Sequence, residues 1–438
     1  MYRDVHPPFY LVLVHYVVLD VGDTEWHLRM PSAVAGVLTV LVVYAIGSRT
    51  YGRRSGLLAA GLTAVCWCPV YFSQEARGNA LMLLFVSMAH WFWFELMTTR
   101  DMDRHIHNAY IVGYSGYALL AAYTHYFGLL MVGLQAAGAF LKSIGDRRVL
   151  HRSMTMYLIV FLGFAPWIPT MLAQFGARTN ISWIERPGEP VFAFAAFLYF
   201  LFNRSRYLLV LVGILYASLA AVIFRENDGP IDLRTVKLFA WSPDGIVLAW
   251  LVLPFLVTYT VSVVSNPVLV HRNLIISLPA AYLLLARAVD RLVPDPRRFA
   301  LVATVLCAFF LGDLVLRMDF YGTPYKEQVR EAIGHIVTND RRYPDALIIG
   351  HTWSATSFDY YFRQHGSSRR VELMGGTRED VERISTALDE RSPRYVWFVR
   401  SHREPETDFM TLLHERFDEV EHHSFIRADV WLFKVKGG

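Results

Sequence analysis

The sequence predicts a polytopic α-helical membrane protein with a C-terminal soluble α/β domain, and three observations support this fold class. Of its 438 residues, 54% are hydrophobic and only 18% are charged, whereas soluble domains carry about 25% charged residues. Apolar runs long enough to span a membrane recur between residues 29 and 316. Residues 317–438 then hold 20 of the 38 Asp and Glu. The net charge of +4, without a dense basic tract, argues against nucleic acid binding.

Ten apolar segments make up the predicted transmembrane domain, 29–316. A span needs about 20 mostly apolar residues. The candidate spans lie near 29–47, 56–73, 79–98, 109–127, 128–142, 154–172, 207–224, 245–264, 274–290 and 299–316. The shortest, 128–142, is counted because of its neighbours.

The basic residues give this domain an orientation. The loops that follow the first, third, fifth, seventh and ninth candidate spans contain 16 Lys and Arg, whereas the opposite loops 73–78, 173–206 and 265–273 contain six. The positive-inside rule makes the first set cytoplasmic. We therefore expect a multi-pass protein of the cytoplasmic membrane, with the opposite loops and residues 317–438 outside.

Residues 1–28 are predicted to form a juxtamembrane segment on the outer face. The stretch 7–20 is apolar but too short to span, and Pro7-Pro8 suits the start of an interfacial helix. A first span that runs from outside to inside calls for another span before it. We expect eleven spans in the complete protein, with its true start upstream of Met1.

Two further segments belong to the outer face. The loop 173–206 contains a 12-residue apolar stretch, VFAFAAFLYFLF, which is too short to cross a bilayer and should lie at the interface or re-enter. The tail 317–438 predicts a small α/β sandwich. Its helices are expected at 325–338, 355–364, 378–390 and 406–417, and its strands at 346–350, 369–373, 394–400 and 430–435.

Candidate site residues gather on the same face, where polar groups beside apolar spans mark functional positions. Asp4 precedes Pro7-Pro8 and could act as a general base or bind a divalent cation, while His6 could contact phosphate. A solvated segment before a helix is the alternative. Gln74, Glu75 and Arg77 lie in a very short loop between two spans. Their alternative role is an ion pair or a helix-start acid.

Two more candidates end or open spans. His125 lies among tyrosines at a span end, where an interfacial histidine without a catalytic role is the competing interpretation. Arg272 is basic in an outer loop, against the overall trend, and its guanidinium suits a phosphate. No P-loop, zincin or nucleophile-elbow motif occurs, and no internal repeat supports a transporter.

Five motifs in order carry a resemblance to a known family. They are HPPFY (6–10), LRMPSA (28–33), SQEAR (73–77), THYFG (124–128) and APWIP (165–169). Together they resemble the multi-span GT-C glycosyltransferases, within these the protein-mannosyltransferase-like group of family 39. The likeness is good over about 1–175 and looser over 265–330. It implies transfer of a sugar from a polyprenyl-phosphate carrier to an acceptor on the outer face, usually with inversion.

The resemblance also implies roles for individual residues. His6 matches a position near the donor phosphate, and Glu75 and Arg77 match a loop that lines the donor cavity. Arg272 matches the Arg of an Arg-Tyr pair, although Asn273 stands in place of the Tyr. Gly78 likewise stands where the family has a larger residue.

The family's catalytic acid, an Asp or Asp-Glu, precedes the double proline by tens of residues and would lie upstream of Met1. This departure puts the activity of the chain as given in doubt and agrees with the expected missing span.

The resulting hypothesis assigns a mechanism. Asp4 or Glu75 deprotonates an acceptor hydroxyl, and His6, Gln74, Arg77, His125 and Arg272 bind the substrates. No cofactor is required by the pattern, although a divalent cation, Mg²⁺ or Mn²⁺, is compatible with it. The expected partners are the polyprenyl-phosphate sugar, a lipid, glycan or protein acceptor, and membrane lipid. The alternatives are an inactive accessory membrane protein on the same scaffold and a flippase for lipid-linked sugars.

Overall fold

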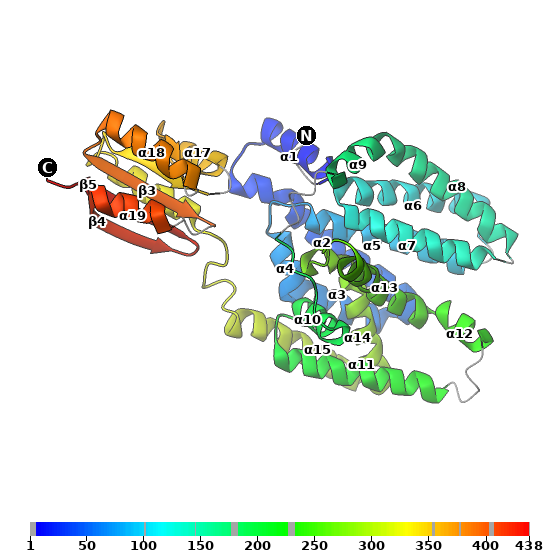
Figure 1. Ribbon diagram of the computed structural model, residues 1–438. Coiled ribbons are helices and arrows are strands. Elements are labelled where there is room, and N and C mark those ends of the chain that lie inside the picture. The colour runs from blue at the N-terminus through cyan, green and yellow to red at the C-terminus, as the bar shows by residue number, and fades with distance from the viewer. Residues whose placement is uncertain are drawn as a thin grey trace. The chain divides into compact units, whose positions relative to one another are not determined.

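The computed structural model describes residues 6–99, 102–144, 146–176, 183–226, 233–352, 355–375, 378–402 and 407–437. The chain divides into two compact units, Met1–Arg317 and Met318–Gly438 (Figure 1). We call them the membrane unit and the C-terminal unit and describe each by itself.

The membrane unit is entirely helical in its described part. Eight of the described helical segments are long and apolar enough to cross a membrane, and a ninth is formed if α3 and α4, bent by 58°, count as one span. The segments that qualify are α2 (Glu25–Tyr51), α5 (Asn79–Thr98), α7 (Tyr126–Ser143), α8 to α9 (Arg147–Gly176), α11 (Arg206–Glu226), α13 (Pro243–Val264), η2 with α14 (His271–Leu292) and α15 with η3 (Pro296–Arg317). The prediction of a polytopic helical membrane protein is confirmed.

The remaining helices of this unit are shorter or more polar. They are α1 (Phe9–Asp20), α3 (Arg53–Val65), α4 (Trp67–Ser73), α6 (Arg104–Thr124), α10 (Pro190–Leu201) and α12 (Leu233–Ala240). Helix α1 begins after Pro8 and has 12 residues, which is too few to span a bilayer. Helix α10 coincides with the 12-residue apolar stretch and is equally short.

Helix α6 differs from the sequence prediction. Residues 109–127 are predicted as a span, and α6 is long enough with 21 residues, but its composition does not pass as a membrane-spanning helix. A polar side chain in its middle bonds to another helix: the Tyr114 hydroxyl donates to Gln135 Oε1 on α7 at 3.1 Å. Helices α6, α7 and α8 lie side by side (Figure 1). Contacts with the neighbouring helices therefore stabilise α6, although its composition is less apolar than that of the other long helices.

The membrane unit has two distinct ends. At one end, α6 finishes and α7 starts around His125, and the short loop between α4 and α5 lies close by, with Gly78 against Thr124. We call this the His125 end. At the other end, which we call the Arg54 end, Arg54 pairs with Asp290 across α3 and α14 at 3.0 Å.

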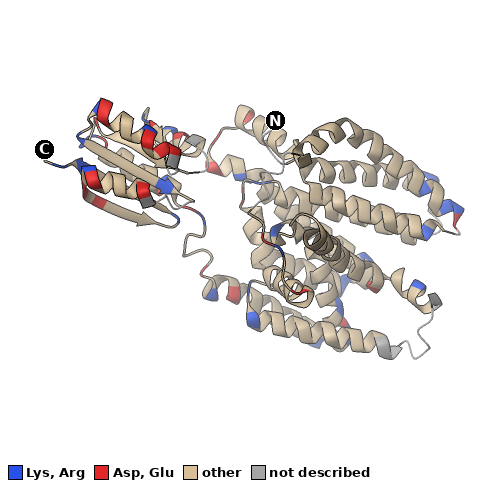
Figure 2. Cartoon of the chain, in the orientation of Figure 1, with Lys and Arg blue, Asp and Glu red and all other residues tan. Residues whose placement is uncertain are grey.

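The C-terminal unit is a three-layer α/β/α domain. Its five-stranded sheet has the order β2-β1-β3-β5-β4, parallel among the first three strands and antiparallel at β5 and β4. Helices α16 and α17 cover one face, and α18 and α19 cover the other. Charged residues are spread over these helices (Figure 2). The elements are α16 (Val329–Asn339), β1 (Leu347–His351), α17 (Ala355–Gln364), β2 (Leu373–Met374), α18 (Arg378–Arg391), β3 (Tyr395–Ser401), α19 (Thr407–Arg416), β4 (Phe417–Phe425) and β5 (Ala428–Val435).

One strand of this sheet is missing from the sequence prediction. Strand β4 follows α19 directly, and it was not expected because its sequence, FDEVEHHSF, is mostly polar on both faces. An edge strand with one buried neighbour tolerates such a pattern. Strand β2 has only two residues, fewer than the predicted 369–373.

Candidate functional site

The loop between α4 and α5 places a carboxylate at the His125 end. The Tyr71 hydroxyl on α4 is hydrogen-bonded to the Glu75 carboxylate, one helical turn further along the chain. The Ser32 hydroxyl on α2 donates to the Arg77 carbonyl oxygen at 3.0 Å. Glu75 is half-buried, whereas Gln74 and Arg77 in the same loop are exposed. The loop is thus fixed to two helices and presents polar side chains.

Gly78 explains why this loop can lie so close to its neighbours. A Cβ at Gly78 would lie 3.1 Å from Thr124 Cγ2 and 3.3 Å from Tyr10 Cβ. Both distances are tighter than ordinary contacts, so a larger residue would push α1 or α6 away. The absence of a side chain at Gly78 therefore lets the loop lie against α1 and α6.

Arg272 brings a second segment to the same place. It lies at the start of the 3₁₀ turn η2 (His271–Ser277), half-buried, and interacts electrostatically with Arg77, Glu75 and Tyr71. Its guanidinium carbon is 5.2 Å from the centre of the Trp183 ring. A cation near an aromatic ring face is attracted to it, so the Trp183 ring helps to hold Arg272 in place.

Two histidines complete the described part of the cluster. The rings of His6 and His125 have centroids 5.3 Å apart. His125 Nδ1 accepts the backbone N–H of Phe127 at 3.1 Å, as the cap of α7. Because Nδ1 accepts, the neutral ring carries its proton on Nε2. His125 can therefore donate one hydrogen bond, and it interacts electrostatically with His6 and Arg272.

Arg204 is a cluster member that the sequence reasoning did not single out. It interacts electrostatically with Tyr71 and His271, and its guanidinium carbon lies 4.2 Å from the centre of the Trp67 ring. Its position depends on a turn in which Asn203 and Arg204 have φ of 55° and 51°. A signal was present, since Arg204 is basic in a predicted outer loop, as Arg272 is.

Asn203 fixes this turn. It is fully buried; its Oδ1 accepts the backbone N–H of Trp67 at 2.6 Å, and its Nδ2 donates to the Phe310 carbonyl oxygen at 3.0 Å. Its own carbonyl oxygen accepts from Arg317 Nη2 at 2.7 Å. One side chain therefore connects the turn to α4 and α15.

The predicted site residues are thus brought together with one exception. His6, Glu75, Arg77, His125 and Arg272 form a connected cluster, and Gln74 lies in its loop. Asp4 lies outside the described residues. Their catalytic and binding roles stay predictions.

A divalent cation is compatible with the sequence, and Asp4, which could bind it, lies outside the described residues. Within the described ranges, the cluster offers no three His, Cys, Asp or Glu ligands close enough to share one ion.

The opposite end of the unit is built differently. At the Arg54 end, Arg49 donates to Glu95 at 2.5 Å and Arg287 donates to Asp244 at 3.3 Å. Figure 2 shows further Lys and Arg at the turn between α7 and α8. These two ion pairs connect neighbouring helices, so the charged side chains in them are paired with each other.

Comparisons with known proteins agree with this picture. Residues 5–172 match the family described as dolichyl-phosphate-mannose-protein mannosyltransferase. The fold is similar to that of ArnT from Cupriavidus metallidurans in the apo state, with a TM-score of 0.59 and 14% identity over 97% of this chain and 87% of ArnT. ArnT bound to undecaprenyl phosphate gives a TM-score of 0.54 at 14% identity, covering 98% of this chain and 88% of ArnT. No curated protein sequence matches this chain.

The motifs that suggested the resemblance, from HPPFY to APWIP, lie within the matched segment. The fold of nearly the whole chain extends the likeness beyond that segment. Residues 5–172 of the chain therefore resemble the protein-mannosyltransferase family in sequence, and nearly the whole chain shares the fold of ArnT.

Proposed function

We propose that the protein transfers a sugar from a polyprenyl-phosphate carrier to a hydroxyl group of a lipid, glycan or protein acceptor. The observation that carries this proposal is the grouping of one carboxylate, Glu75, with Arg77 and Arg272 at one end of the membrane unit. A phosphate leaving group needs positive charge, and an attacking hydroxyl needs a base. The ArnT structure bound to undecaprenyl phosphate supports the carrier class.

The proposed reaction is a single displacement. The acceptor oxygen attacks C1 of the sugar from the side opposite the phosphate, and its proton passes to the Glu75 carboxylate. The bond between C1 and the phosphate oxygen breaks, and its electron pair stays on the polyprenyl phosphate. The sugar is thereby inverted at C1. The hydrogen bond from Tyr71 orients the Glu75 carboxylate toward this task.

The arginines and histidines receive the departing charge in this proposal. Arg272 and Arg77 interact electrostatically, and we propose that they share the phosphate, since the cluster holds two arginines to one glutamate even before Arg204 is counted. An Arg fork binds two phosphate oxygens. The Nε2–H of His125 adds one donor, and His6 lies beside it.

The orientation in the membrane is part of the proposal. The Arg54 end carries the predicted cytoplasmic loops, which are rich in Lys and Arg, and the His125 end would then face outward. Helix α15 runs from the Arg54 end to Arg317, which bonds Asn203 at the His125 end. The C-terminal unit that follows would accordingly be extracytoplasmic, and the membrane the cytoplasmic one.

Binding of undecaprenyl phosphate to the purified full-length protein tests the donor assignment. Arg272→Ala should weaken binding about 10- to 100-fold, because hydrogen bonds to charged groups contribute about 1.5–3 kcal/mol. Arg298→Ala, an exposed arginine near the Arg54 end, is the matched control and should bind as the wild type does. Equal affinities of the two variants would contradict the proposal.

A further inference from the structure

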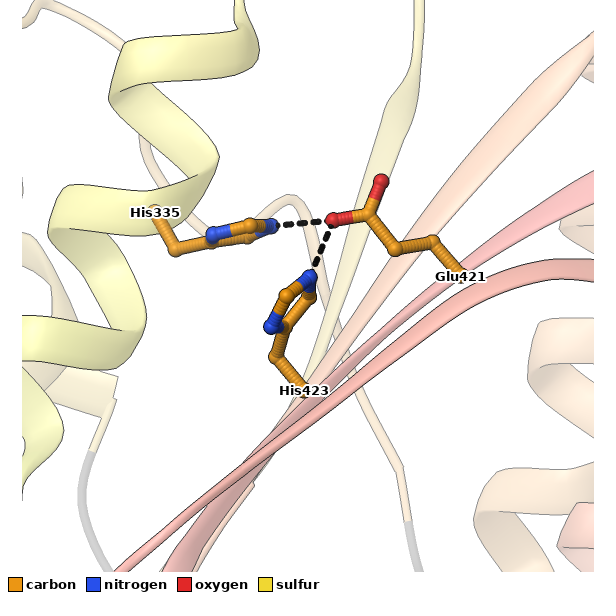
Figure 3. A group of neighbouring side chains, drawn as sticks. All are labelled: His335, Glu421 and His423. Carbon is orange, nitrogen blue, oxygen red and sulfur yellow. Dashed lines mark hydrogen bonds and ion pairs between the residues drawn. The ribbon is translucent and has the colours of Figure 1, made fainter.

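Three potential metal ligands converge in the C-terminal unit, and none of them is among the residues assigned to sugar transfer. They are His335 on α16 and Glu421 and His423 on β4, and one ligand atom from each lies within 4.8 Å of the other two (Figure 3). His335 Nε2 is 2.6 Å from Glu421 Oε1, and His423 Nε2 is 2.7 Å from the same oxygen. The two imidazole centroids are 4.2 Å apart.

The directions of these three side chains follow from the strand and the helix that carry them. Strand β4 is the edge strand, and Glu421 and His423, two residues apart, point to the face that α16 covers. His422 between them points to the other face, where it stacks on Trp431 with centroids 4.5 Å apart. The His335 ring packs edge-on against Trp397 at 5.8 Å, which fixes its direction. The ligand directions are therefore set by the sheet and the helix.

We propose that these three residues bind a zinc ion that links α16 to the edge strand β4. Two imidazole nitrogens and one carboxylate oxygen are a ligand set that zinc takes in proteins, with water at the fourth position. Nitrogen donors favour zinc over Mg²⁺ and Ca²⁺, which prefer oxygen.

The distances suit insertion of the ion after a small movement. Ligands at zinc distances in a tetrahedron lie about 3.3 Å apart, so the nitrogens of His335 and His423 have to move away from Glu421 Oε1 by about 0.7 Å and about 0.6 Å. The side chains of Glu421 and His423 can supply this movement because they are 28% and 48% exposed. The same exposure gives the ion access from solvent and leaves room for the water.

Zinc binding to the full-length protein tests this site. The purified wild type, stripped with a chelator and dialysed against micromolar ZnCl₂, should retain one zinc per chain more than Glu421→Gln or His335→Ala. His414→Gln is the matched control, because His414 pairs with Glu419 at 3.4 Å on the same unit without belonging to the three-ligand group. It should retain the wild-type amount, as should Glu75→Gln, which changes the membrane unit only.

A second measurement shows directly whether each variant is folded. ZnCl₂ should raise the thermal unfolding midpoint of the wild type and of His414→Gln, since the ion binds the folded state. It should not raise that of His423→Gln, in which the most exposed ligand is replaced. The proposal is overturned if the wild type retains no zinc, or if Glu421→Gln and His414→Gln retain equal amounts.

Discussion

Asn203 supports the site through two buried hydrogen bonds, and Asn203→Ala should disrupt both. The substitution leaves the Trp67 N–H without its partner, and it removes one donor from the Phe310 carbonyl oxygen, which keeps the N–H of Asp313. It also places Ala at a φ of 55°, a conformation that Asn tolerates and Ala does not. The turn that positions Arg204 should become less ordered, although Arg204 itself is unchanged in this variant.

The size of the effect follows from the burial of these groups. Asn203 is 0% exposed, so water cannot replace the lost partner. The unpaired Trp67 N–H costs about 1–3 kcal/mol, and loss of the bond to Phe310 adds about 0.5–1.5 kcal/mol. Strain at the left-handed position adds about 1–2 kcal/mol. We expect a clear fall in the thermal unfolding midpoint and weaker binding of undecaprenyl phosphate.

Hydrogen exchange at the Trp67 amide reports the first bond directly. A loss of about 1–3 kcal/mol in local protection corresponds to about 5- to 150-fold faster exchange. Asn203→Asp is the paired variant, because a carboxylate still accepts from Trp67 but cannot donate to Phe310. Exchange at Trp67 should therefore accelerate in Asn203→Ala and not in Asn203→Asp. Unchanged exchange in Asn203→Ala would refute the reasoning.

Two further predictions concern packing and pH. Gly56→Ala should destabilise the contact between α2 and α3, because its Cβ would lie 2.6 Å from the backbone N of Ser48. Gly133→Ala, whose Cβ would have no atom within 4 Å, should stabilise α7 by up to about 1 kcal/mol. Thermal unfolding of both variants checks this prediction, and equal stability of the two variants would contradict it. In the C-terminal unit burial alone would raise the pKa of Asp429, but the hydrogen bonds from Ser424 and Arg400 outweigh burial and hold this pKa below its ordinary value. Its contribution to stability is therefore present above the ordinary Asp pKa of about 4 and is lost as pH falls through the folded value. The stability difference between wild type and Asp429→Asn should shrink under acid, and a difference that is constant down to about pH 2 would contradict it.

The fold class could be predicted from the sequence because hydropathy averaged over a whole segment shows whether that segment can span a membrane. Most helices of the membrane unit lie where apolar runs of span length occur, from α2 to α15. Helix α6 shows the limit of this signal, because its stability comes from contacts such as the bond between Tyr114 and Gln135, which no hydropathy average contains. Strand β4 shows the same limit in the sheet, where an edge position replaces the alternating pattern.

The candidate site was predictable where residues are close in sequence. Glu75 and Arg77 share a short loop, and that loop could only lie at a membrane surface. The turn at Asn203 and Arg204 was not predictable, because neither residue is a glycine and its bonds reach 136 residues back to Trp67 and 107 forward to Phe310. Only the folded chain brings such distant groups together.

The same holds for the proposed zinc site. His335 lies 86 residues before Glu421 in the sequence, without the short ligand spacing by which zinc sites are recognised. The pattern Glu-x-His on β4 does not predict a metal site by itself, because the third ligand comes from α16, which covers that face of the sheet. Long-range pairing of helix and strand creates this site.

The most direct test of the proposed function measures free polyprenyl phosphate by mass spectrometry in membranes that contain the full-length protein and the glycosylated carrier. The account predicts release by the wild type and by Arg298→Ala. It predicts a loss of about 100-fold or more in Glu75→Gln, the size expected when a general base is removed, and of at least about tenfold in Arg272→Ala. Release at the wild-type rate by a folded Glu75→Gln protein would contradict the assignment of Glu75 as the base.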